Sequence, residues 1–518
     1  MSSWKQFTKN YFSYPEIGLA LDLSRMNYPE NLFSALETSC AAAFSEMVAL
    51  EAGAIANADE QRMVGHYWLR NSDLAPSKEI KLQIDQAIQA VIEFAKIARS
   101  QFKRAILVGI GGSALGPQFL IDALSDQLFP IEFLDNTDPD GVDRLTAVRL
   151  GLLKETLVIV ISKSGSTLET RNGQIELAVR FSRSKLNFAD HTVAITCAAS
   201  KLEHQAKAEK WLKILPLWDW VGGRTSIFSP VGLLPAALSG INLQELLAGA
   251  RLMDQLTRIK EIKKNPAMLL ALMWHAAGSG VGLKDMVVLP YKDRLILFSR
   301  YLQQLVMESL GKEKNRAGAI VNQGIAVYGN KGSTDQHAYV QQLRDGINNF
   351  FVTFIEVLSD SAQTNPQVEV EPGITSGDYL SGFYLGTRQA LTENGRASIT
   401  ITVESVSAQT IGALIALYER AVGFYATLVN VNAYHQPGVE AGKKAAAGVI
   451  ALQREIQQEL NNSGQLYTAE ELASKLKADT EITFKILEHL AANQHAGVTK
   501  RNAQDPLQAK YSISRKRS

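Results

Sequence analysis

The chain has 518 residues, which is more than one hydrophobic core ordinarily serves, so several domains are expected. Hydrophobic residues make up 46% and charged residues 20% of the sequence, a composition that excludes a disordered or fibrous protein. Lys and Arg total 53 against 52 Asp and Glu, so no overall charge steers the chain toward nucleic acid or an anionic membrane.

The cysteines and the apolar segments indicate the compartment. Cys40 and Cys197 stand in no metal-ligand or redox spacing, so we expect buried thiols in a reducing environment. The first residues lack the continuous apolar stretch of a signal peptide. The apolar segment 410–431 is interrupted by Glu419 and Arg420, which predicts a core helix rather than a membrane span. A cytoplasmic protein without membrane contact is expected.

In chain order, residues 1–50 are assigned to an N-terminal helical arm and residues 51–265 to a first domain. Short buried strands, separated by stretches long enough for helices, are predicted at 105–108, 130–135, 156–161, 192–196 and 212–215. This alternation predicts an α/β domain with a doubly wound, mainly parallel sheet. Ligands of such sheets bind at the carboxyl ends of the strands.

A glycine-rich loop at 109–117 follows the first of these strands. Small residues such as Gly112 let backbone N–H groups approach an oxyanion, and Ser113 adds a hydroxyl donor at the start of a helix. The same glycines also fit a dinucleotide fingerprint, with Asp135 as the ribose ligand. Taken alone, this loop leaves both ligands open.

A second loop follows the strand at 156–161 and holds four hydroxyls and a lysine. These residues are Ser162, Lys163, Ser164, Ser166 and Thr167. Hydroxyls and amides can surround a phosphate monoester from several sides. The alternative is a polar turn that only caps a helix. Two such loops at strand ends favour a sugar phosphate over NAD.

Arg224 follows Gly222 and Gly223 in a flexible turn. A fixed guanidinium there can stabilise a developing oxyanion. A surface salt bridge is an equally good interpretation from this turn alone.

Residues 266–460 are assigned to a second domain of the same architecture, with strands predicted at 286–289, 325–328, 350–357 and 398–403. A predicted helix at 295–310 carries Gln304 and Glu308, whose spacing of four places both on one face. An apolar pocket would raise the pKa of Glu308 and suit it to proton transfer between adjacent carbons. The alternative is a solvated surface carboxylate.

Two later motifs carry further candidates. His337 follows the strand at 325–328 in a loop at a carboxyl end, where it can transfer a proton or have a structural role. Gln436 and Lys443 bracket a Pro-Gly turn, where Lys443 is most simply an exposed helix lysine.

Residues 461–518 are predicted to form a small C-terminal appendage. Thr468 and Glu471 fit a capping box that opens a helix, and a second helix at 482–490 completes a helix-turn-helix with a winged-helix-like end. Positions 500–518 hold six basic residues against one acidic. Nucleic-acid binding is one interpretation, but a helical appendage with a solvated tail is favoured.

Six motifs of the chain resemble, in order, those of the glucose-6-phosphate isomerase family. The resemblance covers roughly residues 50–450, and the motifs are 109–117, 162–170, 222–229, 304–312, 333–346 and 436–443.

The resemblance implies two sugar-isomerase (SIS-type) domains and an aldose–ketose isomerase that needs no metal or nicotinamide cofactor. Glu308 would move a proton between C2 and C1 through a cis-enediol(ate), and Arg224 would stabilise its charge. The remaining roles it implies are phosphate binding by Gly112, Ser113, Ser162, Lys163, Ser164 and Thr167, ring opening by His337 and Lys443, and binding of sugar hydroxyls by Gln304 and Gln436. The family is homodimeric, with His337 contributed across the interface.

The chain departs from the family at Gly165, where bulkier residues are frequent, and at Leu305-Val306, where Gly-Asp is usual. Two rival hypotheses remain. A nicotinamide-dependent dehydrogenase would use the first loop, and a phosphosugar-sensing regulator would bind DNA through the appendage. Use of mannose 6-phosphate is left open.

Overall fold

The computed structural model describes residues 3–147, 150–361, 368–493 and 497–513. The chain divides into two compact units, Met1–His435 and Gln436–Ser518. The larger unit contains two sheets, which confirms the predicted α/β class. The predicted domain boundaries at 50, 265 and 460 stay predictions.

The first sheet consists of five parallel strands in the order β4-β3-β5-β6-β7. The strands are β3 (Arg104–Val108), β4 (Ile131–Leu134), β5 (Thr156–Ile161), β6 (Thr192–Thr196) and β7 (Lys213–Pro216). All lie at or within two residues of the predicted positions, because fully buried parallel strands are continuous hydrophobic runs bounded by polar turns.

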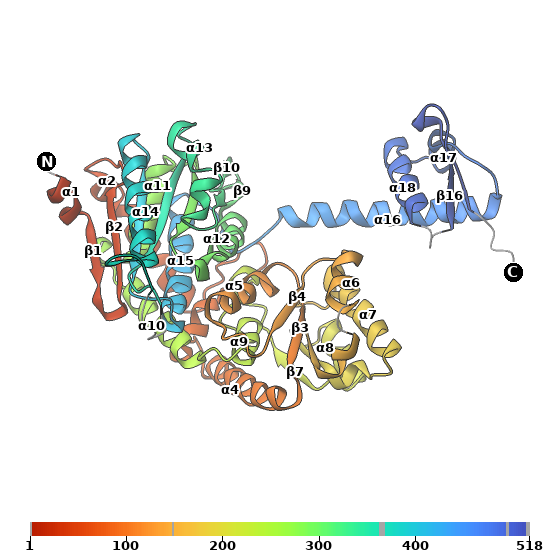
Figure 1. Ribbon diagram of the computed structural model, residues 1–518, viewed down its shortest axis with the longest axis horizontal. Helices are drawn as coiled ribbons and strands as arrows, with labels where there is room; N and C mark the ends of the chain where they lie inside the picture. Colours follow the sequence, from red (N-terminus) through yellow and green to blue (C-terminus); the bar gives the residue numbers. More distant parts are fainter. Residues whose placement is uncertain (1–2, 148–149, 362–367, 494–496, 514–518) are drawn as a thin grey trace. The chain divides into compact units, whose positions relative to one another are not determined.

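Helices cover both faces of this sheet (Figure 1). In β5, Leu157 and Ile159 contribute to one hydrophobic cluster, while Val158 and Val160 contribute to the other. The first cluster includes residues of α4 (Lys78–Gln101), α5 (Leu115–Leu124) and α9 (Pro230–Leu238), and on the other face lie α6 (Pro139–Ala147), α7 (Leu168–Arg183) and α8 (Lys201–Ala208).

The strand order reverses between β3 and β5, because the chain moves from β3 outward to β4 and then back to β5. In open α/β sheets, ligands bind at the carboxyl ends of the strands at such a switch point. The two predicted phosphate loops follow these two strands, so the topology brings them together at one edge of the sheet.

The second sheet has six strands in the order β1-β2-β15-β12-β8-β11. The strands are β1 (Tyr11–Tyr14), β2 (Leu19–Arg25), β8 (Asp285–Pro290), β11 (Val327–Tyr328), β12 (Phe350–Val357) and β15 (Ser398–Val403). The last four are parallel and follow the same outward-and-back order as the first four strands of the first sheet.

The N-terminal stretch corrects one prediction. Residues 1–50 were expected to form a helical arm, but β2 pairs antiparallel with β15, and β1 pairs antiparallel with β2. A strand is favoured over a helix here because the strand buries Leu19, Leu21 and Leu23 almost fully in the core of the second sheet. Helices in this stretch are α1 (Ser3–Lys9), α2 (Leu32–Ala35) and α3 (Glu37–Glu51).

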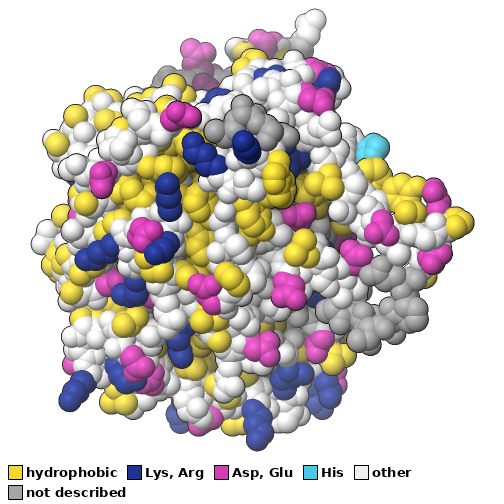
Figure 2. Space-filling model, turned by 90° about the vertical axis from the view of Figure 1, so that its left-hand side faces the viewer, with side chains coloured by type: hydrophobic (Ala, Val, Ile, Leu, Met, Phe, Trp, Pro, Cys, Tyr) yellow, Lys and Arg dark blue, Asp and Glu magenta, His cyan; other side chains and the backbone are white. Residues whose placement is uncertain are grey.

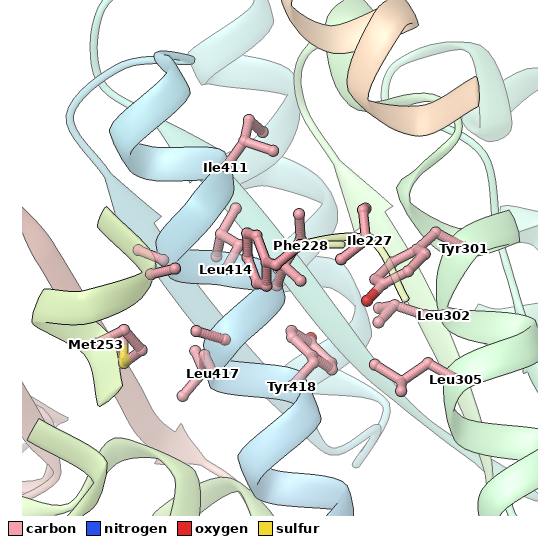
Figure 3. Packing of buried hydrophobic residues seen from close by; sticks show 14 of the residues in the cluster. Ile227, Phe228, Met253, Tyr301, Leu302, Leu305, Ile411, Leu414, Leu417 and Tyr418 are labelled. Atoms are coloured by element: carbon pink, nitrogen blue, oxygen red, sulfur yellow. The ribbon is translucent and has the colours of Figure 1, made fainter. Parts of the chain in front are cut away.

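The long apolar segment forms a core helix, α15 (Ala408–Leu428), as predicted. Its most apolar window would suffice to cross a membrane by length and composition, but 89% of that window is buried inside the fold. Figure 3 shows side chains of α15, such as Leu417 and Tyr418, between Met253 of α10 (Leu243–Thr257) and Leu302.

The charges that interrupt this helix are paired inside the core. Arg420 forms salt bridges with Glu51 and Asp254, and Glu419 pairs with Arg70. Their side chains are at most 7% exposed, so each needs its partners, because an isolated buried charge is very costly. A segment with internal charges can therefore be a core helix.

Shorter elements complete the larger unit. These are α11 (Pro266–Ala277), α12 (Phe298–Leu302), α13 (Val340–Asp345), α14 (Ser376–Glu393), and the strand pairs β9 (Lys312–Lys314) with β10 (Ile320–Gln323) and β13 (Glu369–Glu371) with β14 (Ile374–Thr375). On the face shown in Figure 2, basic and acidic side chains are interspersed, in keeping with the balanced net charge.

The smaller unit consists of α16 (Gly438–Ser463), two short helices and a hairpin. These are α17 (Ala469–Leu476), α18 (Thr480–Ala492), and β16 (Val498–Arg501) paired with β17 (Lys510–Ile513). The predicted capping box of Thr468 and Glu471 is present. Leu460, Leu487 and Tyr511 lie in a separate hydrophobic core. The winged-helix designation stays a prediction, and the basic residues at 515–517 lie outside the described part of the chain.

Candidate active site

The first phosphate loop follows β3 and contains a short turn, η4 (Gly111–Ser113), before α5 begins. Gly111 has a φ of +59°, which favours glycine. A Cβ at Gly112 would collide with the carbonyl group of Gly223, so this loop lies directly against the turn that carries Arg224. Gly112 and Ser113 are only partly buried, which leaves their polar groups accessible to a ligand.

The second loop follows β5 and is organised by its own hydroxyls. The Ser162 hydroxyl accepts a hydrogen bond from the backbone N–H of Gly165 at 3.0 Å and donates to the Thr167 hydroxyl at 3.3 Å. Thr167 is the N-cap of α7, but its side chain makes no capping hydrogen bond. Because the first N–H groups of a helix lack intrahelical partners, the start of α7 is suited to bind an anion.

Gly165 explains one departure from the family pattern. Its φ is +69°, and a Cβ there would collide with the backbone of Leu202 at the start of α8. Both observations require glycine in this packing. The hydroxyls of Ser164 and Ser166, on either side of Gly165, are hydrogen-bonded to each other at 2.6 Å.

Lys163 connects this loop to the segment before Arg224. Its ammonium group donates to the carbonyl oxygens of Asp219 at 2.7 Å and Val221 at 3.1 Å. Burial and the nearby charge of Arg62 lower the pKa of Lys163. Binding of an anion would relieve this electrostatic cost, which is consistent with a phosphate subsite.

Arg224 lies in η7 (Gly223–Thr225), and its side chain is only 5% exposed. Its Nε donates to the Ser309 hydroxyl at 2.7 Å, and Nη2 donates to the carbonyl oxygens of Ala433 and, at 3.2 Å, His435. Burial lowers the pKa of Arg224, while Glu308 acts in the opposite direction. The guanidinium is therefore a fixed, largely dehydrated cation rather than a surface salt-bridge partner.

Glu308 lies beside this cation. Its Oε1 is 3.7 Å from Nη1 of Arg224, and its side chain is 20% exposed. The second carboxylate oxygen, Oε2, is buried and has no hydrogen-bond partner among the described residues. A buried carboxylate oxygen without a partner is costly to maintain. Its presence here indicates an atom that is available to substrate.

The segment that carries Glu308 differs from the predicted α-helix. Residues Gln303–Glu308 form a π-helical segment, η10, directly after α12. A π-helix has more residues per turn than an α-helix. A spacing of four residues therefore does not place positions 304 and 308 on one face as it does in the predicted α-helix. Single π-helical turns occur frequently at functional sites.

Apolar packing holds this segment from behind. Leu305 and Val306 are almost fully buried. Figure 3 shows Leu302 and Leu305 beside Tyr418 of α15, and all belong to the same hydrophobic cluster. The departure at Leu305-Val306 therefore lies on the core side of the segment. The side chain of Glu308 is more exposed than those of Leu305 and Val306.

Gln304 approaches the first loop. A Cβ at Gly111 would lie 3.1 Å from Nε2 of Gln304, so the amide is close to the glycine-rich turn. The first loop thus contacts both the turn that carries Arg224 and the segment that carries Glu308. The second loop is connected to the chain just before Arg224 by the hydrogen bonds of Lys163.

Of the remaining candidates, His337 belongs to the larger unit, whereas Gln436 and Lys443 belong to the smaller unit. His337 ends η11 (Thr334–His337), and its side chain is exposed, without a contact to Glu308 in the described part of the chain. Gln436 is the first residue of the smaller unit. Lys443 falls in α16, but its side chain lies outside the described residues.

Sequence reasoning missed three residues beside Arg224 and Glu308. Ser309 accepts a hydrogen bond from Arg224, and Arg62 donates to the carbonyl of Asp219 at 2.7 Å. Lys312 donates from its ammonium group to the main-chain carbonyl of Glu308 at 2.7 Å. Ser309 and Lys312 lie inside the 304–312 motif, which was the available signal, whereas nothing in the sequence singles out Arg62.

The dinucleotide alternative receives no support from its ribose candidate. Oδ2 of Asp135 accepts a hydrogen bond from the Gln118 amide at 2.8 Å, which gives this carboxylate a structural partner but does not occupy its second oxygen. No group of three or more His, Cys, Asp or Glu that can hold a metal ion occurs among the described residues.

Comparisons with known proteins identify similar chains. A family model described as phosphoglucose isomerase matches residues 23–373 and 386–468. The chain is 57% identical over 524 residues to a glucose-6-phosphate isomerase of Geotalea daltonii, with 98% of each chain covered. It is also 57% identical over 506 residues to one of Thermosynechococcus vestitus, with 95% of each covered. A crystal structure of a glucose-6-phosphate isomerase from Chlamydia trachomatis matches with a TM-score of 0.79 and 25% identity, covering 87% of this chain and 91% of that chain.

Proposed function

The chain belongs to the phosphoglucose isomerase family, and we propose that it interconverts glucose 6-phosphate and fructose 6-phosphate at the cluster of Arg224 and Glu308. It is an aldose–ketose isomerase of the glycolytic pathway, and its reaction is reversible. The observation that carries the site assignment is the carboxylate oxygen Oε2 of Glu308, which is buried beside Arg224 and has no hydrogen-bond partner in the described part of the chain.

Phosphate binding is assigned to the two loops at the switch point of the first sheet. The hydroxyls of Ser113, Ser162, Ser164 and Thr167, the amide of Gly112 and the start of α7 would surround the phosphate, and Lys163 would add charge. Two observations support this assignment. Both loops lie at the carboxyl ends of neighbouring strands, and the hydroxyls of the second loop form two hydrogen-bonded pairs, Ser162 with Thr167 and Ser164 with Ser166.

Proton transfer is assigned to Glu308. In the open-chain aldose, the carboxylate removes the proton from C2, and the electron pair moves through C1 to the carbonyl oxygen, giving a cis-enediol(ate). Return of the proton to C1, with the hydroxyl proton passing from O2 to O1, gives the ketose. The negative charge that develops on oxygen faces Arg224, whose fixed geometry needs no reorganisation during the reaction.

The remaining assignments rest on the family resemblance. His337 and Lys443 would assist ring opening, and Gln304 and Gln436 would hold substrate hydroxyls. We infer a cytoplasmic homodimer in which His337 acts across the subunit interface. The exposed position of His337 and its lack of contact with Glu308 within the described chain support that arrangement.

The test is a coupled assay of glucose 6-phosphate formed from fructose 6-phosphate, run without added metal and with a chelator present. For Glu308→Gln we expect kcat to fall by about 10²–10⁴-fold, because a positioned general base contributes that much, with KM little changed. Glu313→Gln, an exposed glutamate of β9, is the matched control. If the wild-type protein binds the phosphosugar but does not convert it, the isomerase assignment is wrong, and a phosphosugar-sensing regulator becomes the better hypothesis.

A further inference from the structure

Lys312 occupies an unusual position behind the proposed base. It is the first residue of β9, and only 5% of it is exposed, although lysines are rarely buried unless they are paired. It forms no salt bridge among the described residues, and its ammonium group donates instead to the main-chain carbonyl of Glu308 at 2.7 Å. A buried cation thus donates its hydrogen bond to the backbone of the residue that carries the proposed base.

The end of the π-helical segment explains why such a contact matters. Carbonyl groups in the last turn of a helix lack intrahelical partners and rely on caps. The helix continues from η10 through Leu310, so Glu308 lies in its last turn, and its carbonyl receives a hydrogen bond from the Lys312 ammonium group. Within the described residues, Oε2 of Glu308 has no hydrogen-bond partner, and Oε1 approaches Arg224 at 3.7 Å. The orientation of this side chain therefore depends on how firmly the backbone at position 308 is held.

We propose that Lys312 is a positioning residue of the isomerase, which fixes the backbone of Glu308 and adds a second positive charge beside Arg224 during enediolate formation. The inference rests on the proposed role of Glu308. It assigns Lys312 no contact with the reacting carbons.

The charges around Lys312 make the proposal testable by pH. Arg224 from η7, Glu308 from η10 and His435 from the segment after α15 face it. Burial and the charge of Arg224 lower the pKa of Lys312 to about 8, against the opposing effect of Glu308. The protonated form supplies the charge, so activity should fall as the pH rises through that value.

The experiment compares wild type with Lys312→Met, which keeps the length of the side chain and removes the charge, and with Lys312→Arg. Lys314→Met, two residues along β9 and exposed, is the matched control. Kinetic constants are measured from pH 6 to 9.5, together with the melting temperature and the binding of glucitol 6-phosphate, a sugar phosphate without a carbonyl group.

For Lys312→Met we expect kcat to fall by about 10- to 100-fold, since small misplacements of a catalytic group cost up to that much. Binding of glucitol 6-phosphate should change by less than about threefold because the phosphate loops are untouched. The alkaline limb of kcat/KM, which reports groups of the free enzyme, should be lost in Lys312→Met and shifted to higher pH in Lys312→Arg.

Two outcomes would overturn the inference. In the first, Lys312→Met keeps the kcat of wild type and the same alkaline limb of kcat/KM. Lys312 would then not be needed, and another group, such as Lys163, would cause the loss of activity at alkaline pH. A reduced kcat that is matched by loss of glucitol 6-phosphate binding and of thermal stability would show a purely structural role. Absence of turnover in wild type would instead overturn the proposed function.

Discussion

At the scale of single residues, Arg224 is the best-held side chain of the site. Hydrogen bonds to Ser309, Ala433 and His435 fix its guanidinium, so we expect it to act by charge in a defined place. Arg224→Met should lower kcat by about 10²–10³-fold, the range seen when one oxyanion-stabilising donor is removed. Arg171→Met, at an exposed position of α7, serves as the control for a lost surface charge. An Arg224→Met enzyme that folds normally and keeps its kcat would contradict this role.

The residues of the site differ in how far the sequence reveals them. Glu308 and Arg224 stand inside motifs whose glycines and strand-end positions could be recognised. Ser309 could not be assigned, because its role depends on a hydrogen bond to a residue 85 positions away. Lys312 was equally hidden, since burial of a lysine is not visible in a sequence that places Glu313 and Lys314 next to it.

At the scale of elements, the loop between β5 and α7 depends on the left-handed conformation of Gly165. Gly165→Ala should cost about 1–2 kcal/mol from the backbone alone, and the collision with Leu202 adds to this. We expect KM for fructose 6-phosphate to rise more than kcat falls, because the phosphate subsite moves. Gly382→Ala in α14, where a Cβ meets open space, should be neutral or slightly stabilising. Equal KM values in wild type and Gly165→Ala would argue against phosphate binding by this loop.

Elements with a strong local pattern were predictable, and elements defined by distant partners were not. β5, β6, β12 and β15 lie at their predicted bounds because each is a short run rich in β-branched and other apolar residues. β2 was missed because its partner, β15, is far away in the chain. The π-helical form of η10 was missed for a different reason: its hydrogen-bond pattern leaves no distinct hydrophobic period in six residues.

At the scale of the whole molecule, the proposed homodimer predicts complementation between two inactive variants. Glu308→Gln and His337→Gln chains are mixed after unfolding and refolded together. If His337 acts across the interface, each mixed dimer contains one intact site, so random pairing should restore about a quarter of the wild-type activity. If His337 serves the site of its own subunit, no mixed dimer contains an intact site. Activity would then stay at the level of the separate variants.

The pairing of β2 with β15 also sets an order of events during synthesis. β2 ends at Arg25 and β15 begins at Ser398, so a ribosome must add more than 370 residues before the partner strand exists. At ordinary translation rates of about 5–20 residues per second, this takes about 20–75 s. The first sheet, whose strands all lie between residues 104 and 216, can meanwhile assemble on the growing chain. During that interval β2 can pair with β1, but its other edge lacks β15, and its leucines lack the core of the second sheet against which they are buried in the finished fold. This apolar hairpin therefore stays exposed on the growing chain until the second sheet is complete.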